Sequence, residues 1–281
     1  MTLTYACIAP HGSEAIPALA SDRLKEKFAP TTAGMRTIAR EAVRARPDVL
    51  VIATPHNLRL SGQIGVVLAE NSSGSLKGSG NRQVSVHAKC EVKFAKTLLN
   101  HAQARGLPVV GANYGTSEGL GSNMPMDWGT LVPLWFVFRA ARSSLRIVIV
   151  TPSREIALKK NFVFGKIIAR LIQSRPQSRF VFIASADQAH AHQKSGLYGF
   201  HSAAAKYDEL VQSAVKTNNL KSLMHLDPGL VEDAKPDSLW QLAMLAGVTE
   251  VVPTRSELIS YQVPTYYGLA CASFYPKVTA K

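Results

Sequence analysis

The sequence predicts an α/β fold in a single large domain, with a mainly parallel or mixed central sheet flanked by helices. Short apolar runs rich in β-branched residues alternate along the chain with longer segments of helical periodicity. The runs are apolar throughout, which is typical of strands buried on both faces, and the alternation is typical of strands joined by helical crossovers. No internal repeat or linker divides the chain, so we expect one domain over residues 1–281.

The first two expected strands, residues 3–9 and 49–52, end in the same way. Each is followed by a proline and then a histidine, His11 or His56. Proline cannot donate to a strand ladder, so each histidine stands just beyond the carboxyl end of its strand. Ligands of open α/β sheets bind at that edge. We therefore expect two neighbouring strands that present both imidazoles on one side, and metal binding is a common task of paired neutral imidazoles.

The rest of the chain continues the alternation of strands and helices. Residues 15–28 and 31–45 favour helices, and Pro30 is expected to end the first. Further strands are expected at residues 63–69, 107–111, 145–150, 180–184, 249–252 and 265–274. Further helices are expected at residues 91–105, 154–172, 203–216 and 236–246.

Two segments rich in glycine and serine are expected to be loops, residues 71–80 and 115–130. We expect the first to be mobile, and both to influence the choice of substrate. The strongly apolar residues 131–138 are expected to lie under or beside the second loop.

A third expected strand, residues 180–184, is also followed by histidines. His190 and His192 are two residues apart, so they point to opposite sides of an extended segment and at most one is expected to face a given site. The remaining histidines are expected to be surface or structural residues. They are His87 and His101, beside a helical pattern, and His201 and His225.

The composition indicates a cytoplasmic protein with a large core. Hydrophobic residues make up 46% of the chain, yet no apolar stretch is long enough to cross a membrane. The first residues lack the basic region and long apolar core of a signal peptide. The three cysteines, Cys7, Cys90 and Cys271, are widely spaced, which favours a reducing compartment and excludes a disulfide framework.

The net charge of +13 is compatible with nucleic acid or with anionic substrates. The basic residues are scattered, and no basic run is interleaved with aromatic residues. We therefore expect a generally basic surface that steers anionic substrates, and we rank a nucleic-acid-binding protein last among the alternatives.

Two histidines and one carboxylate can hold Fe(II) and leave coordination positions open for substrate and dioxygen. His11 and His56 supply the imidazoles. Three acids, Glu232, Asp233 and Asp237, are candidates for the carboxylate. Acids near the start of a helix are often only partners of the helix dipole, so the pattern alone leaves this choice open. His190 is suited to general acid or base chemistry, because the unperturbed pKa of histidine lies near physiological pH.

Several blocks of sequence together resemble the class III extradiol ring-cleavage dioxygenases, of the type of the protocatechuate 4,5-dioxygenase catalytic subunit. The blocks, in order, are APHG (9–12), ATPHN (53–57), DWGTLVPLWF (127–136), SADQAHAH (185–192), YGFHSAAAKYDE (198–209), AKPDSLWQL (234–242) and YQVPTYYG (261–268). The resemblance implies the fold of that family and non-haem Fe(II). His11, His56 and an acid would hold the iron, and His190 matches the catalytic histidine.

The family pattern also bears on the acid and on the substrate pocket. Asp237 matches the family's acidic ligand better than Glu232 does, by its distance from the helix that ends at Gly247, although the family ligand is usually Glu. Ring-cleaving members often carry a histidine after the Asp of the DxGT block, where this chain has Trp128. An indole cannot shuttle a proton but can stack on an aromatic ring. With Asn57 and Asp127, Trp128 is a candidate residue of the substrate pocket.

We therefore predict an Fe(II)-dependent extradiol dioxygenase, an oxidoreductase that places both atoms of O2 in a catechol- or aminophenol-type compound. Mn or Zn could occupy the same ligands. We expect a small aromatic substrate, no nucleic acid or membrane partner, and a homo-oligomer, with a small second subunit left open. The alternative is a metal-binding relative without ring cleavage, acting as a hydrolase-like enzyme or an interaction module.

Overall fold

A mixed sheet of eleven strands forms the centre of the computed structural model, which describes residues 3–78, 81–141 and 145–277. The strands are β1 (Leu3–Ala9), β2 (Val49–Ala53), β3 (Ile64–Val67), β4 (Asn71–Lys77), β5 (Gln83–Cys90), β6 (Val109–Ala112), β7 (Asn123–Pro125), β8 (Arg146–Thr151), β9 (Phe180–Ser185), β10 (Thr254–Gln262) and β11 (Leu269–Pro276). Their main order is β10-β11-β1-β9-β2-β8-β5-β4-β7, and β3 pairs with β6 and β8. This α/β architecture confirms the predicted fold class.

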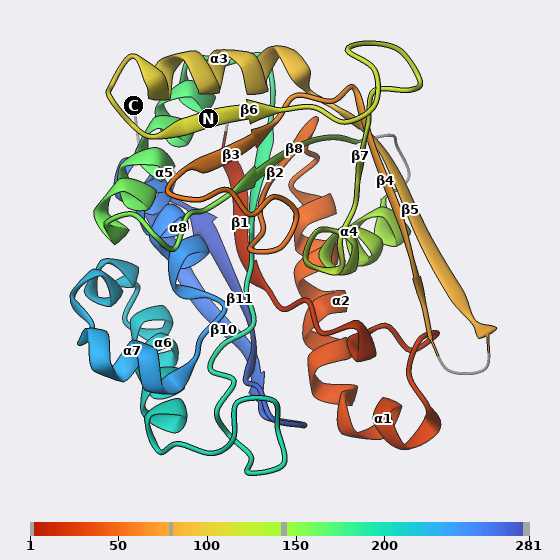
Figure 1. The fold of residues 1–281 in the computed structure, drawn as a ribbon, viewed down its shortest axis with the longest axis vertical. Coiled ribbons are helices and arrows are strands. Elements are labelled where there is room, and N and C mark those ends of the chain that lie inside the picture. The colour runs from red at the N-terminus through yellow and green to blue at the C-terminus, as the bar shows by residue number, and fades with distance from the viewer. Residues whose placement is uncertain (1–2, 79–80, 142–144, 278–281) are drawn as a thin grey trace.

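Helices cover both faces of the sheet (Figure 1). They are α1 (Asp22–Lys27), α2 (Ala29–Arg44), α3 (Val92–Gln103), α4 (Trp128–Ala140), α5 (Leu158–Gln173), α6 (Ala203–Lys216), α7 (Pro228–Ala234) and α8 (Leu239–Val251). Short 3-10 turns lie at Ser13–Ala15 and Leu220–His225. No helix within the described ranges has the length and apolar character needed to cross a membrane.

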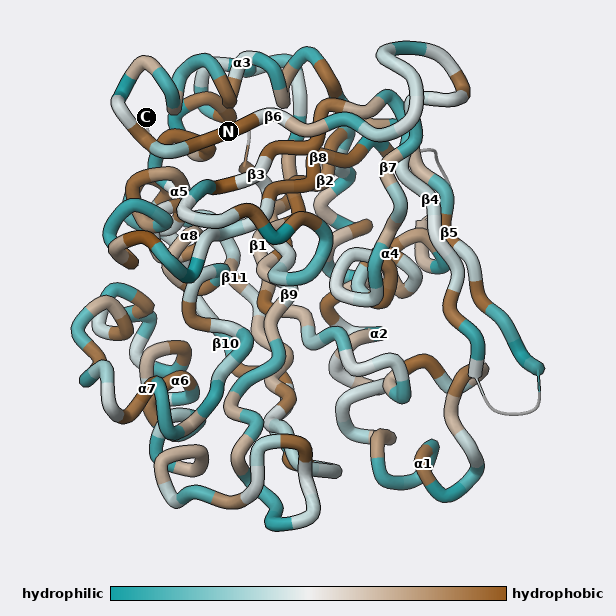
Figure 2. Tube along the Cα trace, viewed as in Figure 1, coloured by the Kyte–Doolittle hydropathy of each residue, from teal (hydrophilic) through white to brown (hydrophobic). Residues whose placement is uncertain are grey.

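The central strands β1, β9, β2 and β8 are parallel and buried, and the tube in Figure 2 is hydrophobic along β2 and β8. Alternate residues of each strand enter different cores. On β2, Val49 and Val51 pack with α3, α5, α6 and α8, whereas Leu50 and Ile52 pack with α2 and α4. Burial on both faces therefore explains why these strands are apolar without a polar alternation.

The strand order corrects one expectation about the two strands that end in Pro–His. We expected β1 and β2 to be neighbours, but β9 lies between them and pairs with both. The histidine-bearing segment that follows β9 therefore leaves the sheet between the ends of β1 and β2. Sequence order could not predict this, because the inserted strand lies more than a hundred residues further along the chain.

The expectation of a loop at residues 71–80 was wrong for residues 71–77. They form β4, which pairs antiparallel with β5, and residues 79–80 lie outside the described ranges. β5 alternates exposed and buried residues, with Val84 and Val86 turned inward and His87 exposed on the strand rather than beside a helix. The serine and glycine content of β4 concealed a strand whose backbone is paired on both sides, by β5 and β7.

Other boundaries also differ from the predictions. Residues 249–251, expected to form a strand, complete α8, and the strand β10 begins after Pro253. Pro30 lies in the first turn of α2, where its missing N–H costs nothing. Arg154 precedes α5 in an irregular segment instead of opening the helix. The apolar residues 131–138 belong to α4, whose first turn is capped by the Asp127 carboxylate accepting from the Thr130 N–H at 2.8 Å.

Helices α5 and α8 pack closely against each other. A Cβ at Gly247 of α8 would overlap the carbonyl oxygen of Phe162, and a Cβ at Gly165 of α5 would overlap that of Met244. The two glycines therefore permit backbone contact between the helices. This contact fixes α8 and, with it, the residues that precede α8.

Candidate metal centre

Three side chains from distant parts of the chain meet at the carboxyl edge of the sheet. His11 follows β1, His56 follows β2, and Asp237 lies just before α8. The Nε2 atoms of His11 and His56 are 3.2 Å apart. The Oδ2 atom of Asp237 lies 3.2 Å from the His11 Nε2 and 2.8 Å from the His56 Nε2. These atoms all lie within 4.8 Å of one another, so the group could hold a metal ion.

The hydrogen bonds of His11 determine which nitrogen carries its proton. The Ser185 hydroxyl donates to the carbonyl oxygen of Gly129, so its oxygen must accept from the Nδ1–H of His11, at 3.0 Å. With the proton at Nδ1, the Nε2 atom of His11 is the ring nitrogen that faces the Asp237 carboxylate. A divalent cation between this nitrogen and the carboxylate would be bound by both, and such a metal fits these donors.

His56 is also suited to bind a metal in its neutral form. Burial, followed by repulsion from His11, lowers the pKa of His56 to about 4. At neutral pH the imidazole therefore has a free lone pair, which metal ligation requires.

A second buried carboxylate, Asp187, stands beside this group. Its Oδ1 accepts from the backbone N–H of His11 at 2.7 Å, and its Oδ2 lies 3.5 Å from the His11 Nε2. Asp187 was not predicted as a site residue. The sequence did contain a signal for it, because Asp187 lies two residues beyond the carboxyl end of β9, as the histidines follow β1 and β2.

His190 lines one cavity with His11, His56 and Asp237, and the orientation of its ring is fixed. Its Nδ1 lies 2.9 Å from the carbonyl oxygen of Gln188, an acceptor, so Nδ1 carries the proton and Nε2 is left as the basic atom. The ring stacks on Tyr267, with centroids 5.3 Å apart and planes inclined by 15°. Burial lowers the pKa of His190, although the nearby Asp187 acts in the opposite direction.

The neighbouring His192 points elsewhere, as its two-residue spacing from His190 predicted. Its Nε2 lies 2.9 Å from the Oδ2 of the buried Asp208 on α6. Asp208 also accepts from the Tyr261 hydroxyl at 2.7 Å and from the Ala189 N–H at 2.9 Å. One carboxylate therefore anchors the segment that carries Asp187 and His190.

The other acids considered as metal ligands lie away from this group. Glu232 is exposed and pairs with Lys235, and Asp233 lies 3.8 Å from the Nε2 of His201. The geometry thus brings Asp237, and neither Glu232 nor Asp233, to the two histidines.

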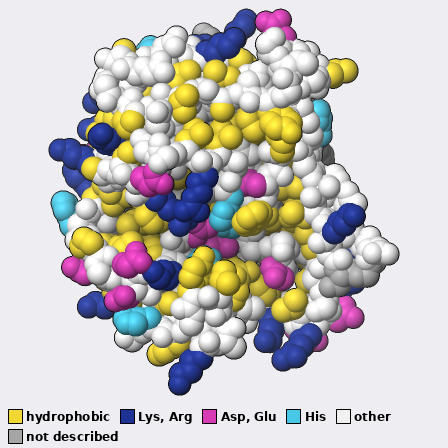
Figure 3. Space-filling model, in the orientation of Figure 1, with side chains coloured by type: hydrophobic (Ala, Val, Ile, Leu, Met, Phe, Trp, Pro, Cys, Tyr) yellow, Lys and Arg dark blue, Asp and Glu magenta, His cyan; other side chains and the backbone are white. Residues whose placement is uncertain are grey.

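A cavity of about 580 Å³ opens over the group. Figure 3 shows histidine, acidic and basic side chains gathered near the middle of this face, with hydrophobic side chains around them. The cavity is lined by cationic side chains (Arg59, Arg154, Lys235), by Glu14, and by aromatic side chains (Trp128, Tyr198, Tyr266, Tyr267).

The three candidate pocket residues occupy different places. Trp128 lines the cavity, and its ring lies over His56 with centroids 4.3 Å apart. The Asp127 carboxylate caps α4. The Asn57 amide donates to the carbonyl oxygen of Pro125 at 2.8 Å. Trp128 is therefore placed to touch a ligand, while Asp127 and Asn57 hold the backbone around it.

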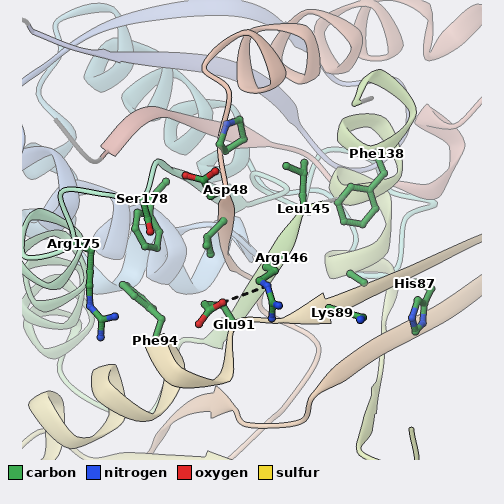
Figure 4. A pocket seen from close by; sticks show the side chains of 14 residues that line it. Asp48, His87, Lys89, Glu91, Phe94, Phe138, Leu145, Arg146, Arg175 and Ser178 are labelled. Carbon is green, nitrogen blue, oxygen red and sulfur yellow. Dashed lines mark ion pairs between the residues drawn. The ribbon is translucent and has the colours of Figure 1, made fainter. Parts of the chain in front are cut away.

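A larger cavity, of about 960 Å³, lies at the opposite edge of the sheet (Figure 4). It is bordered by the first residues of three parallel strands, Val49, Arg146 and Phe180. Its charged side chains include an ion pair between Arg146 and Glu91, at 3.6 Å. No group of potential metal ligands was found here among the described residues, so the cavity at the carboxyl edge is the candidate site.

Comparison with known proteins is consistent with this geometry. A family described as the catalytic LigB subunit of aromatic ring-opening dioxygenase matches residues 5–271. Protein CA_C1420 of Clostridium acetobutylicum is 25% identical over 264 residues, which cover 93% of this chain and 55% of that protein. The chain therefore spans about half the length of this curated relative.

A solved structure shares the fold. The crystal structure of uncharacterized protein JW3007 from Escherichia coli K12 aligns with a TM-score of 0.61 and 16% sequence identity, over 96% of this chain and 99% of that one. The family match covers nearly all of the sequence, including His11, His56, His190 and Asp237. The chain therefore belongs to the family of catalytic LigB subunits of aromatic ring-opening dioxygenases.

Proposed function

We propose that the protein is a non-haem Fe(II)-dependent extradiol dioxygenase that opens the ring of a catechol- or aminophenol-type compound with O2. The observation that carries this proposal is the meeting of the His11 and His56 Nε2 atoms with the Asp237 Oδ2 beneath a cavity that His190 also faces. Two imidazoles and one carboxylate are the ligands of many non-haem iron oxygenases, and they leave positions open.

His11, His56 and Asp237 would hold the ion, and Mn or Zn could occupy the same ligands. Bound Fe(II) would supply the redox-active centre at which dioxygen and the substrate react, with both oxygen atoms entering the product. The protein contributes position and proton transfer around that centre.

His190 would act as the general base and later as the general acid. Its Nε2 is free of the proton held at Nδ1, so it can accept the proton of a substrate hydroxyl and return it to the ring-opened product. Tyr267 stacks on the imidazole and restricts its motion. Trp128 offers an aromatic face at the cavity wall, where a substrate ring could stack.

The second candidate function is metal binding without ring cleavage, in a hydrolase-like enzyme or an interaction module. Two observations favour it: Trp128 stands where ring-cleaving relatives often have a histidine, and the acidic ligand is the shorter Asp237. Both functions require the same metal centre, so turnover separates them.

The experiment starts from protein loaded with Fe(II) in the absence of oxygen. Catechols and aminophenols are added, oxygen is admitted, and oxygen uptake is followed together with the visible absorbance of ring-opened product. His56→Ala should lose both metal and turnover, whereas His190→Ala should lose turnover and keep metal. His101→Ala, an exposed change on α3, is the matched control and should behave as the wild type.

Each outcome has a distinct meaning. Stoichiometric metal with no turnover on any substrate would favour the second function. Absence of metal binding by the wild-type protein would contradict both.

A further inference from the structure

The two oxygens of the Asp237 carboxylate face different partners, and Arg154 is the partner of one of them. The arginine follows β8, the strand beside β2, and its guanidinium forms an ion pair with the Oδ1 of Asp237. The other oxygen, Oδ2, faces the Nε2 atoms of His11 and His56. One oxygen is thus directed towards the metal position, and the other towards a fixed positive charge.

The guanidinium is held in place from two sides. It lies over the ring of Trp240, with its central carbon 4.6 Å from the ring centroid. Asp237 and Trp240 flank the start of α8, so both contacts come from one short segment. About two thirds of the Arg154 side chain is covered, with 33% exposed. An arginine stacked and paired in this way has little freedom to leave the carboxylate.

The Asp237 carboxylate has few other constraints. The Gln241 amide donates to the Asp237 backbone carbonyl at 2.7 Å, which fixes the main chain and not the carboxylate. Among the residues that the structure describes, Arg154 is the charged side chain that pairs with Oδ1. The rotation of the carboxylate about its last bond is therefore set by Arg154 on the Oδ1 side and by His11 and His56 on the Oδ2 side.

A carboxylate can bind a cation through one oxygen or through both, and the choice affects which metal is preferred. Ions such as Mn²⁺ favour several oxygen ligands, whereas Zn²⁺ accepts a small set rich in nitrogen. We infer that Arg154 is a positioning residue that restricts Asp237 to one ligating oxygen and so biases the site against metals that prefer oxygen. This inference uses the metal centre of the proposed function but not its ring-cleavage chemistry.

The test measures metal affinities on the metal-stripped full chain, with Zn²⁺, Co²⁺ and Mn²⁺ as separate probes against a competing chelator. In Arg154→Gln the second oxygen becomes free, and the ratio of Mn²⁺ to Zn²⁺ affinity should rise about tenfold or more. Arg154→Lys keeps a positive charge beside Oδ1 and should restore a ratio close to that of the wild type.

The visible absorption of bound Co²⁺ gives a second readout, because it weakens as the coordination number rises. It should be weaker in Arg154→Gln than in the wild type. The control is Arg146→Gln, which removes the same charge at the opposite edge of the sheet and should leave both readouts unchanged. Circular dichroism and thermal unfolding check that each variant is folded.

An unchanged affinity ratio in Arg154→Gln would overturn the inference, as would an equal loss of affinity for all three metals. A protein that binds metals with the predicted ratios and cleaves no ring would contradict the proposed function and leave this inference standing. An active dioxygenase whose ratio does not respond to Arg154→Gln would contradict this inference alone.

Discussion

The proton on His11 is controlled by one hydroxyl group, that of Ser185. Because the Ser185 hydroxyl donates its hydrogen bond to the Gly129 carbonyl, the serine oxygen can act only as an acceptor towards His11 Nδ1. The Nε2 lone pair of His11 is thereby directed at the metal position before any metal arrives. Partners of metal ligands commonly contribute to affinity in this way.

Replacement of Ser185 by alanine should therefore weaken metal binding by about 10- to 100-fold, since the His11 ring loses its fixed tautomer. Metal affinity by chelator competition measures the effect. Ser72→Ala, which removes another buried hydroxyl that donates to a carbonyl, should leave the affinity unchanged. Equal affinities in Ser185→Ala and the wild type would mean that the tautomer is set by other groups.

His190 should determine the acidic side of the pH–activity profile. Burial lowers its pKa below the ordinary 6.5, so the basic form is present at neutral pH and is lost only as pH falls through the lowered value. kcat should thus keep more than half of its maximal value at pH 6.5, the ordinary pKa of histidine, and should decline as pH falls further.

In His190→Gln, kcat should fall by about 10²- to 10⁴-fold, and the decline at low pH should disappear. The measurement is a pH profile at saturating substrate with metal content checked at each pH. A decline that persists in this variant would assign the titrating group to another residue.

The residues of the site differ in how readily they can be predicted from the sequence. His11 and His56 could be predicted because a proline–histidine pair ends an apolar strand in both cases. Asp237 needed the family resemblance, since three acids lie close together. Arg154 gave no signal, because its contact with Asp237 depends on the placement of β8 beside β2 and on the irregular segment before α5.

At the scale of elements, the close backbone contact with α5 holds α8 in a fixed position against that helix. Replacement of Gly247 by alanine would force the Phe162 carbonyl away and should lower the free energy of unfolding by about 1–3 kcal/mol. Urea unfolding measures this change. Lys159→Ala, an exposed change on α5, should stay within about 0.5 kcal/mol of the wild type. A similar small change for Gly247→Ala would show that the two helices separate easily.

The segment after β9 is held by α6 through Asp208. In Asp208→Asn, an amide nitrogen replaces one of the two accepting oxygens, so a buried donor loses its partner. We expect a loss of about 1–3 kcal/mol in stability and a reduced kcat, with metal content retained, because Asp187 and His190 are loosened while the three metal ligands are not.

Unfolding curves, metal analysis and kcat together test this expectation. Asp233→Asn, on the surface, is the control and should alter none of them. Loss of metal from Asp208→Asn would mean that the Asp208 carboxylate supports the metal ligands as well as the segment that carries Asp187 and His190.

The elements show where sequence patterns are informative. The strands of the parallel centre and α6 could be predicted because apolar runs and helical spacing are clear there. The β4–β5 pair was missed, since the serines and glycine of β4 resemble a loop and its stability comes from pairing with β5 and β7. The position of β9 between β1 and β2 could not be predicted from the sequence either, because strand order depends on contacts between distant segments.

At the scale of the whole molecule, the net charge of +13 should affect substrate capture. Three cationic and three carboxylate side chains line the cavity, so the attraction of an anionic aromatic substrate comes from the charge of the whole molecule, over a distance that salt shortens to about 10 Å at 0.1 M. kcat/KM for a catechol carboxylate should fall several-fold as ionic strength rises from about 0.05 to 0.5 M. For a neutral catechol it should change little, and parallel declines for both would exclude steering.

The place of the metal centre in the sheet also has a consequence for the folding of the chain. His11 and His56 are 45 residues apart, and His11 and Asp237 are 226 apart. β1 can pair in register only after residues near 180 and 270 have reached it. No local folding event can therefore assemble the ligands, and contacts of such long range form slowly.

A growing chain thus lacks the complete site until the segment before α8 has been synthesised and the strands of the sheet have paired. Metal that binds the finished site stabilises the native state alone, by about 2.7 kcal/mol when its concentration is one hundred times the Kd. A metal that binds this site would therefore be taken up late, after the fold is complete.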